Sequence, residues 1–221
     1  MPRERVLAAA MRLLDRGFFR IGSESYAEEN DTYGIATMGK RHVTIAGDRV
    51  TFDYEAKGGQ QRVQSIDDRE VANIVRTLKK RRGGGEELLA YKEGGRWADV
   101  KSADINAYLK EATGGDFSAK DFRTWSGTVL AAIALAVAGM ASGSKTSRKR
   151  AKTRAVKEVA RYLGNTPAVC RASYIDPRVF DRYAEGATIA TALKSLDEVE
   201  TAAPALQRRI ERAVLALLED D

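Results

Sequence analysis

The sequence predicts an α+β fold that is mostly helical, with a small three-stranded antiparallel sheet near its start. Apolar and polar residues alternate within about 41–66, and apolar residues recur at helical spacing before and after this stretch. The chain has 221 residues, 43% of them hydrophobic, which is enough to build a buried core. We therefore expect a single domain over 1–221, mostly helical over 67–221.

The first elements follow from these two periods. Apolar residues over 6–14 recur at helical spacing, and Gly17 is expected to end that helix. In the sheet, Val43 and Ile45 alternate with polar neighbours, as do the residues over 50–54. Lys57 lies at or beside the second turn of this sheet, because two glycines follow it.

Helices dominate the remainder. Ser118 and Thr166 are suitable N-caps, and Pro167 suits the first position of a helix. The later elements are expected in this order: a helix over about 71–82, a short extra strand over 88–91, a helix from 102, a long buried helix over about 120–139, a basic helix over about 147–163, a short helix from 167, and a last helix over 203–218.

Composition restricts the function classes. The formal net charge is +6 and the pI is about 9.4, which favours a polyanionic partner, although such a charge also serves solubility. One cysteine, Cys170, and one histidine exclude an intramolecular disulfide and a zinc site of the usual ligands. The apolar run 129–141 is too short to span a bilayer. We expect no metal, no cofactor and a cytoplasmic protein, nucleoid-associated if bacterial.

Four residues together indicate chemistry on a phosphodiester. Tyr174 follows a helix end and a short capped helix, and Arg20, Lys57 and Arg123 lie far upstream. A tyrosine can attack phosphorus when cations surround it, an arginine fork can hold two phosphate oxygens, and a lysine can protonate the leaving alkoxide. Each residue alone is ordinary: a lone arginine is usually an ion-pair residue, and a lysine beside glycines is usually a solvated turn residue.

The order of these segments resembles the catalytic domain of type IB DNA topoisomerases, in the poxvirus and bacterial branch. The resemblance covers essentially the whole chain, and five weak motifs occur in the right order. The matching segments are Phe18-Phe19-Arg20-Ile21-Gly22, Glu29-Asn30-Asp31-Thr32-Tyr33-Gly34, the hairpin from His42 to the Lys57-Gly58 turn, Lys120-Asp121-Phe122-Arg123-Thr124, and Gly164-Asn165-Thr166-Pro167 followed by Tyr174.

The resemblance implies an isomerase that relaxes supercoiled double-stranded DNA without metal or ATP. If the resemblance holds for each residue, Tyr174 attacks one strand and forms a 3′-phosphotyrosine, and Lys57 protonates the leaving 5′ hydroxyl. Arg20 and Arg123 neutralise the scissile phosphate. Lys120 supports DNA contact and catalysis. Tyr26 matches a DNA-contacting tyrosine of the family.

The chain departs from the family pattern in two places. The family has histidine where this chain has Asn165, whose amide donates to a phosphate oxygen but carries no positive charge. We expect retained activity with weaker transition-state stabilisation, or compensation by another group. His42 matches a sheet position and is not expected to replace it. An N-terminal clamp domain of the family is expected to be absent, which would make binding weaker and more sensitive to salt.

Two alternatives remain open at this stage. A tyrosine recombinase or integrase shares the Arg, Lys, Arg, Tyr set, although Lys120 stands where recombinases typically carry histidine. A catalytically weakened DNA-binding domain is supported by Asn165 alone. A monomer suffices for single-strand cleavage, so we expect one. The basic helix over about 147–163 is expected to face DNA, and the alternative is that its charges only face solvent. The preceding loop, 141–146, is expected to act as a hinge.

Overall fold

The computed structural model describes residues 1–139, 144–194 and 203–219, apart from the side chains of Tyr26, Glu28, Ala203 and Pro204. Of the hinge expected at 141–146, residues 141–143 lie outside the described residues, whereas Ser144 caps the helix Lys145–Leu163, which includes 145 and 146. The chain divides into two compact units, Met1–Arg123 and Thr124–Asp221. Each unit is described by itself below.

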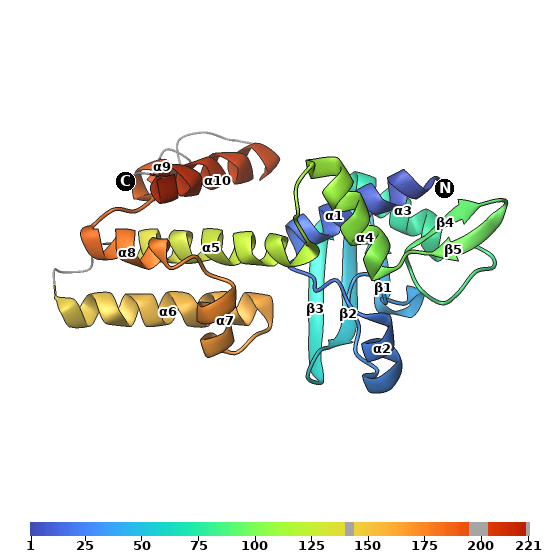
Figure 1. Ribbon diagram of the computed structural model, residues 1–221, viewed down its shortest axis with the longest axis horizontal. Coiled ribbons are helices and arrows are strands. Elements are labelled where there is room, and N and C mark those ends of the chain that lie inside the picture. The colour runs from blue at the N-terminus through green and yellow to red at the C-terminus, as the bar shows by residue number, and fades with distance from the viewer. Residues whose placement is uncertain (140–143, 195–202, 220–221) are drawn as a thin grey trace. The chain divides into compact units, whose positions relative to one another are not determined.

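The first unit contains the predicted three-stranded antiparallel sheet. Its strands β1 (Val43–Ala46), β2 (Arg49–Ala56) and β3 (Gln60–Asp67) are ordered β1-β2-β3, as Figure 1 shows. Val50, Phe52 and Tyr54 alternate along β2 and are all buried, whereas Asp53 and Glu55 between them are exposed. The alternation therefore forms the predicted strand and gives it one buried face. The fold as a whole is mostly helical with this small sheet, as the sequence predicts.

Three helices of the first unit, α1 (Arg3–Gly17), α3 (Arg69–Lys79) and α4 (Ser102–Thr113), share one core with the buried side of the sheet. The core joins Leu7, Leu13 and Leu14 of the first helix to Phe52 of the sheet and Val75 of a later helix. The other helical elements are α2 (Glu24–Asn30) and the 3-10 turn η1 (Lys40–His42).

Two local expectations need correction in this unit. The short strand expected near 88–91 is β4 (Ala90–Glu93), and it pairs with a second strand, β5 (Arg96–Asp99), in a two-stranded hairpin. Gly17 ends α1 as expected, and the left-handed cap after it is Phe18, with φ 55°. His42 lies in η1 just before β1, where its Nδ1 accepts a hydrogen bond from the Gly39 N–H.

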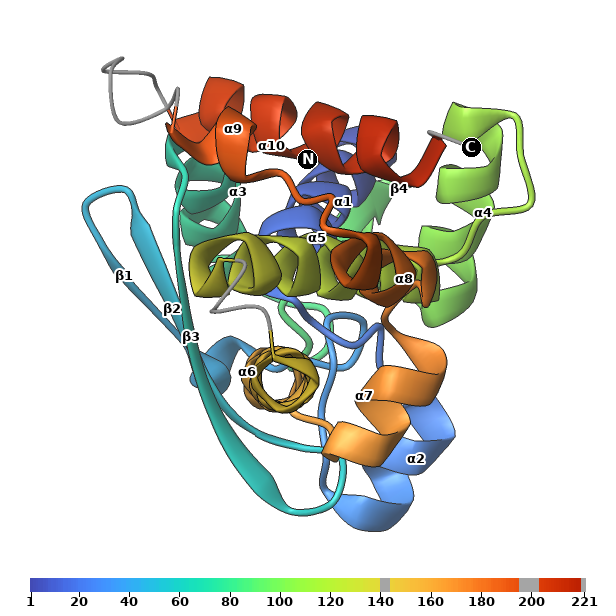
Figure 2. The ribbon, with the colours of Figure 1, turned by 90° about the vertical axis from the view of Figure 1, so that its left-hand side faces the viewer.

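The second unit is helical throughout its described part. The long helix α5 (Ala119–Ala138) begins in the last residues of the first unit and continues into the second. Figure 2 looks along α6, and α5 and α7 lie beside it. The helices that follow α5 are α6 (Lys145–Leu163), α7 (Pro167–Ser173), α8 (Arg178–Glu185), α9 (Ala190–Lys194) and α10 (Ala203–Glu219).

Two arginines of α8 form hydrogen bonds with the end of the last helix, α10. Arg178 Nη1 donates to the carbonyl oxygen of Leu218 at 3.2 Å, and Arg182 Nε donates to that of Leu217 at 3.2 Å. Two backbone acceptors at the end of α10 thus receive charged donors, which suits the negative end of a helix. Within the described ranges, no helix combines the length and apolar character needed to cross a membrane.

Candidate active site

The segment that carries Arg20 is held by backbone hydrogen bonds on its inner side. The carbonyl oxygen of Arg20 accepts from the Ile35 N–H at 2.9 Å, and that of Ile21 accepts from the Ala36 N–H at 2.8 Å. Gly34 makes this pairing possible, because a Cβ there would lie 2.3 Å from the Gly22 nitrogen and 2.8 Å from the Arg20 oxygen. The half-buried Arg20 side chain therefore projects from a fixed backbone.

A second arginine is bound to the same segment. Arg123 Nη1 donates a hydrogen bond of 2.6 Å to the carbonyl oxygen of Phe18, across 105 positions of sequence. Arg123 is 4% exposed and lies in the first turns of α5. The two predicted phosphate-binding arginines thus belong to one local structure within the first unit.

A buried tyrosine lies near both arginines. Burial raises the pKa of Tyr54 to about 12, and the charges of Arg62, Arg123 and Arg20 act in the opposite direction. All three guanidinium groups therefore lie within electrostatic range of one phenol. The Tyr54 hydroxyl donates to Gln64 Oε1 at 2.8 Å, and the Gln64 amide nitrogen donates in turn to the carbonyl oxygen of Gly17.

The Tyr54–Gln64 pair was not foreseen from the sequence. Tyr54 pairs with Arg62 in the sheet register and Gln64 with Phe52, so the contact is diagonal between β2 and β3. The available signal was the period of two in β3, which puts Gln64 on the same face as the buried Ile66. The contact holds Gln64 where its amide nitrogen binds the Gly17 carbonyl oxygen, three positions before Arg20.

The remaining predicted cations of the first unit are exposed. Lys57 lies in the turn between β2 and β3, where Gly58 and Gly59 have φ of 85° and 70°. Such angles favour glycine, so the turn is built to project Lys57 at the tip of the hairpin. Lys120 is exposed in the first turn of α5. Tyr26 lies in α2, and its side chain is outside the described part of the structure.

The second unit holds Asn165 and Tyr174 at the two ends of a short helix. The helix α6 ends at a left-handed Gly164, and the Asn165 N–H donates to the carbonyl oxygen of Ala160 at 3.0 Å. Thr166 then caps α7, with its Oγ accepting from the Val169 N–H at 3.3 Å. Tyr174 is the residue that ends α7, with its N–H donating to the Cys170 oxygen at 3.0 Å.

The backbone of Tyr174 is docked on α5. A Cβ added at Gly127 would lie 2.3 Å from the Tyr174 carbonyl oxygen, so only glycine allows this approach. One residue further along α5, the Thr128 hydroxyl accepts from the Asp176 N–H at 3.0 Å and donates to the Thr124 carbonyl oxygen at 2.8 Å. The half-buried Tyr174 is therefore placed by contacts on both sides of it along the chain.

Comparison with known proteins shows the family. Residues 1–203 match the model described as "Eukaryotic DNA topoisomerase I, catalytic core". This chain belongs to the DNA topoisomerase I family. It is 29% identical to "DNA topoisomerase 1B" of Acanthamoeba polyphaga mimivirus over 184 residues, which are 78% of this chain and 53% of that protein. It is 30% identical to "DNA topoisomerase 1" of Candidozyma auris over 124 residues, 55% of this chain and 15% of that protein.

The chain thus spans about half the length of the mimivirus protein and a small part of the fungal one. Within this topoisomerase-family core, the first unit binds Arg123 to the segment that carries Arg20 and places Lys57 in the turn between β2 and β3. The second unit brings Asn165 and Tyr174 to one short helix. Sequence reasoning missed Tyr54, Gln64, Gly34 and Gly127, which act on the positions of these residues.

Proposed function

We propose that this chain is the catalytic part of a type IB DNA topoisomerase, of the poxvirus and bacterial branch. It relaxes supercoiled duplex DNA by cutting one strand, allowing rotation and rejoining the same strand. The observation that carries the proposal is the link from Arg123 to the Arg20 segment, since it gathers two guanidinium groups from distant parts of the chain. Paired arginines suit the pentacoordinate phosphorus of the transition state, whose non-bridging oxygens gain negative charge.

In the proposed reaction, the Tyr174 oxygen forms a bond to the scissile phosphorus. The bond from phosphorus to the 5′ oxygen breaks, and Lys57 supplies the proton for that leaving oxygen. Arg20 and Arg123 hold the non-bridging oxygens, and Asn165 donates a further hydrogen bond. Lys120 and Tyr26 contact the DNA. The 3′-phosphotyrosine keeps the energy of the broken bond, so the reverse attack by the 5′ hydroxyl needs no ATP.

The helix α5 carries one of the proposed catalytic residues and one contact of another. Arg123 and Gly127 are four residues apart in this helix, which is about one turn. Because the Tyr174 backbone lies against Gly127, the helix that carries the arginine also carries the seat of the tyrosine. The three cations supply the positive charge for the transition state, so the proposal requires no metal. One nucleophile suffices for one strand, and we expect a monomer working on DNA in the cytoplasm or nucleoid.

The test is plasmid relaxation. Wild-type protein should convert supercoiled plasmid into a ladder of topoisomers in EDTA without ATP, and Tyr174→Phe should abolish it. Tyr91→Phe, in β4, serves as a matched control and should relax normally. Binding without any change in linking number would contradict the proposal and favour a weakened DNA-binding domain. Joined products between two DNA sites would favour a recombinase.

A further inference from the structure

The helix α6 carries a charge pattern that works against its own stability. Its first part is dense in cations, and the first acidic residue is Glu158. Cations near a helix N-terminus oppose the macrodipole, and like charges four residues apart repel each other. Lys145 and Lys149 form such a pair, as do Arg150 and Arg154. A bound polyanion would reverse both effects.

The six cations of α6 from Arg148 to Lys157 fall into two groups. Arg148 and Lys152 serve the fold: Arg148 Nη1 donates to the Ala184 oxygen at 3.2 Å, and Lys152 Nζ lies 6.0 Å from the centroid of the Phe180 ring. The other group is exposed, and none of its members forms an ion pair with an acidic side chain in the described parts of the chain. These residues are Lys149, Arg150, Arg154 and Lys157.

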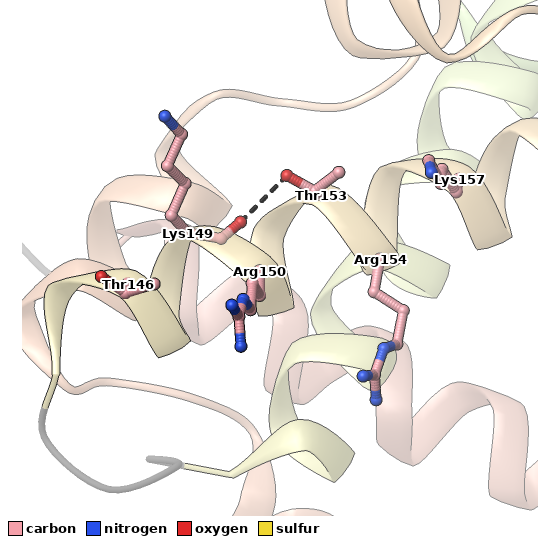
Figure 3. Close-up of a pocket in the computed structure, with 6 residues that line it drawn as sticks. All are labelled: Thr146, Lys149, Arg150, Thr153, Arg154 and Lys157. Atoms are coloured by element: carbon pink, nitrogen blue, oxygen red, sulfur yellow. Dashed lines mark hydrogen bonds between the residues drawn. The ribbon is translucent and has the colours of Figure 1, made fainter.

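The second group lines one surface hollow together with Thr146 and Thr153. Figure 3 shows the six residues in sequence along α6, with Lys149 extending to one side of the helix and Arg150 and Arg154 to the other. The Thr153 hydroxyl donates to the Lys149 carbonyl oxygen at 3.0 Å, which keeps it against the helix. From Lys149 to Lys157 the hollow follows the axis for about 12 Å. We call these six residues the α6 track.

We propose that the α6 track binds the sugar–phosphate backbone of duplex DNA, separately from the residues that break the bond. This inference rests on the proposed function for the identity of the polyanion. Four cations spread along an open hollow suit a series of phosphates better than one small anion, which needs convergent donors. The lining residues include no aromatic side chain on which an unpaired base could stack, so the track suits a duplex backbone rather than a single strand.

The position of the track indicates its role. Lys157 precedes the end of α6 at Leu163 by about 9 Å of helix, and Asn165 and the Tyr174 helix follow that end. A strand backbone on the track would extend away from the nucleophile. The track should therefore contribute affinity and salt dependence, without changing the rate of bond breakage once DNA is bound.

The test compares two double variants that lose the same charge. Lys149→Ala with Arg154→Ala removes two cations of the track, and Arg208→Ala with Arg212→Ala removes two exposed cations of α10 as the control. Both pairs are made in the Tyr174→Phe background, and duplex binding is measured by fluorescence anisotropy at 50–200 mM NaCl. Alanine is the best helix former, so both helices should persist, as circular dichroism would check.

The track variant should bind duplex more weakly at every salt concentration. The slope of log affinity against log salt should become less steep by about 1.8, because two phosphate contacts are lost. The control variant should then lose about tenfold more affinity than the track variant between 50 and 200 mM. With Tyr174 restored and DNA saturating, the track variant should cleave within about twofold of wild type, since the chemical groups are untouched.

Equal slopes for the two double variants would overturn the inference, and so would an equal loss of binding to single-stranded DNA of the same length. Failure of the proposed function gives a different result. A wild-type protein that relaxes no plasmid, but whose track variant shows the smaller slope, would refute the enzyme and keep the track. Normal relaxation with unchanged slopes would refute the track and keep the enzyme.

Discussion

Arg123 donates a hydrogen bond of 2.6 Å to the carbonyl oxygen of Phe18, two residues before Arg20. The acceptor is exposed to this donor because Phe18 leaves the helix in the left-handed conformation, with φ 55°. The guanidinium has several donors, so one can hold the protein backbone while others face a phosphate. Arg123 is therefore both a ligand for phosphate, in our proposal, and a brace for the other arginine.

Replacement of Arg123 by lysine should slow DNA cleavage by about 10²–10³. A lysine keeps the charge but has no planar fork, so it cannot hold the Phe18 oxygen and a phosphate with fixed geometry. The measurement is single-turnover cleavage at saturating DNA. Arg49→Lys, in an exposed ion pair at the start of β2, is the control and should cleave normally. A near wild-type rate for Arg123→Lys would show that charge alone is sufficient.

Gly127→Ala should slow cleavage by about a hundredfold, since its Cβ would force the Tyr174 backbone from its seat. In an open helix the same change would stabilise the protein by about 0.5–1 kcal/mol. Ser126→Ala, at the neighbouring position of α5, is the control. Cleavage at the wild-type rate by Gly127→Ala would mean that the close approach has no bearing on the nucleophile.

Lys57→Ala should slow cleavage of ordinary DNA strongly, because the leaving 5′ oxygen then lacks its proton donor. A substrate with a sulfur at the 5′ leaving position needs no acid and should restore most of the rate. The comparison of the two substrates in rapid-quench experiments checks this. If the sulfur substrate is cleaved as slowly as ordinary DNA, Lys57 acts in some other way, such as contact with the backbone.

Asp68 should be a main source of stability in the first unit. Its carboxylate caps α3 by accepting from the Glu70 and Val71 N–H groups, and it binds Arg12 and Arg16, both at 2.6 Å. Asp68→Ala should lower the free energy of unfolding by about 3 kcal/mol. Asp68→Asn retains a good N-cap and should cost less. Urea unfolding of the two variants measures the difference.

The same carboxylate should make stability sensitive to acid. Burial raises the pKa of Asp68, but hydrogen bonds from Val71 and Arg12 and the charges of Arg12 and Arg16 outweigh it, and the pKa is below 3.8 in the fold. Because the folded-state pKa is the lower one, the contribution is present above pH 3.8 and is lost as the pH falls through the folded-state value. The gap between wild type and Asp68→Asn should shrink in acid, and a constant gap would contradict this.

Most helices and strands were predictable because the spacing of apolar residues that indicates each one lies within the element itself. The alternation in β2 and the spacing in α1 and α3 each reflect one buried face, and the structure has these elements where the sequence predicts them. The strand β5 was missed because its four residues include two charges and only one large apolar side chain, Trp97. Gly94 and Gly95, with φ of 54° and 82°, were the overlooked hairpin signal.

The site was less accessible to sequence reasoning. The approach of Arg123 to Phe18 joins residues 105 positions apart, and no local pattern encodes it. The diagonal contact of Tyr54 with Gln64 depends on the register and twist of two strands, and the seat of Tyr174 on Gly127 depends on helix packing. The roles of Arg20, Lys57, Lys120, Asn165 and Tyr174 followed from the resemblance, and they stay predictions.

The most direct measurement is the chemical identity of the covalent bond to DNA. Wild-type protein is mixed with a suicide substrate, a nicked duplex whose short cleaved fragment dissociates and prevents rejoining. The reaction is quenched with denaturant and the protein is digested. Mass spectrometry then identifies the peptide that carries the nucleotide. We predict a single adduct on Tyr174, joined to a 3′ phosphate, with a free 5′ hydroxyl on the released strand. An adduct on another residue, a 5′ linkage, or no adduct under conditions that relax plasmid DNA would contradict the account.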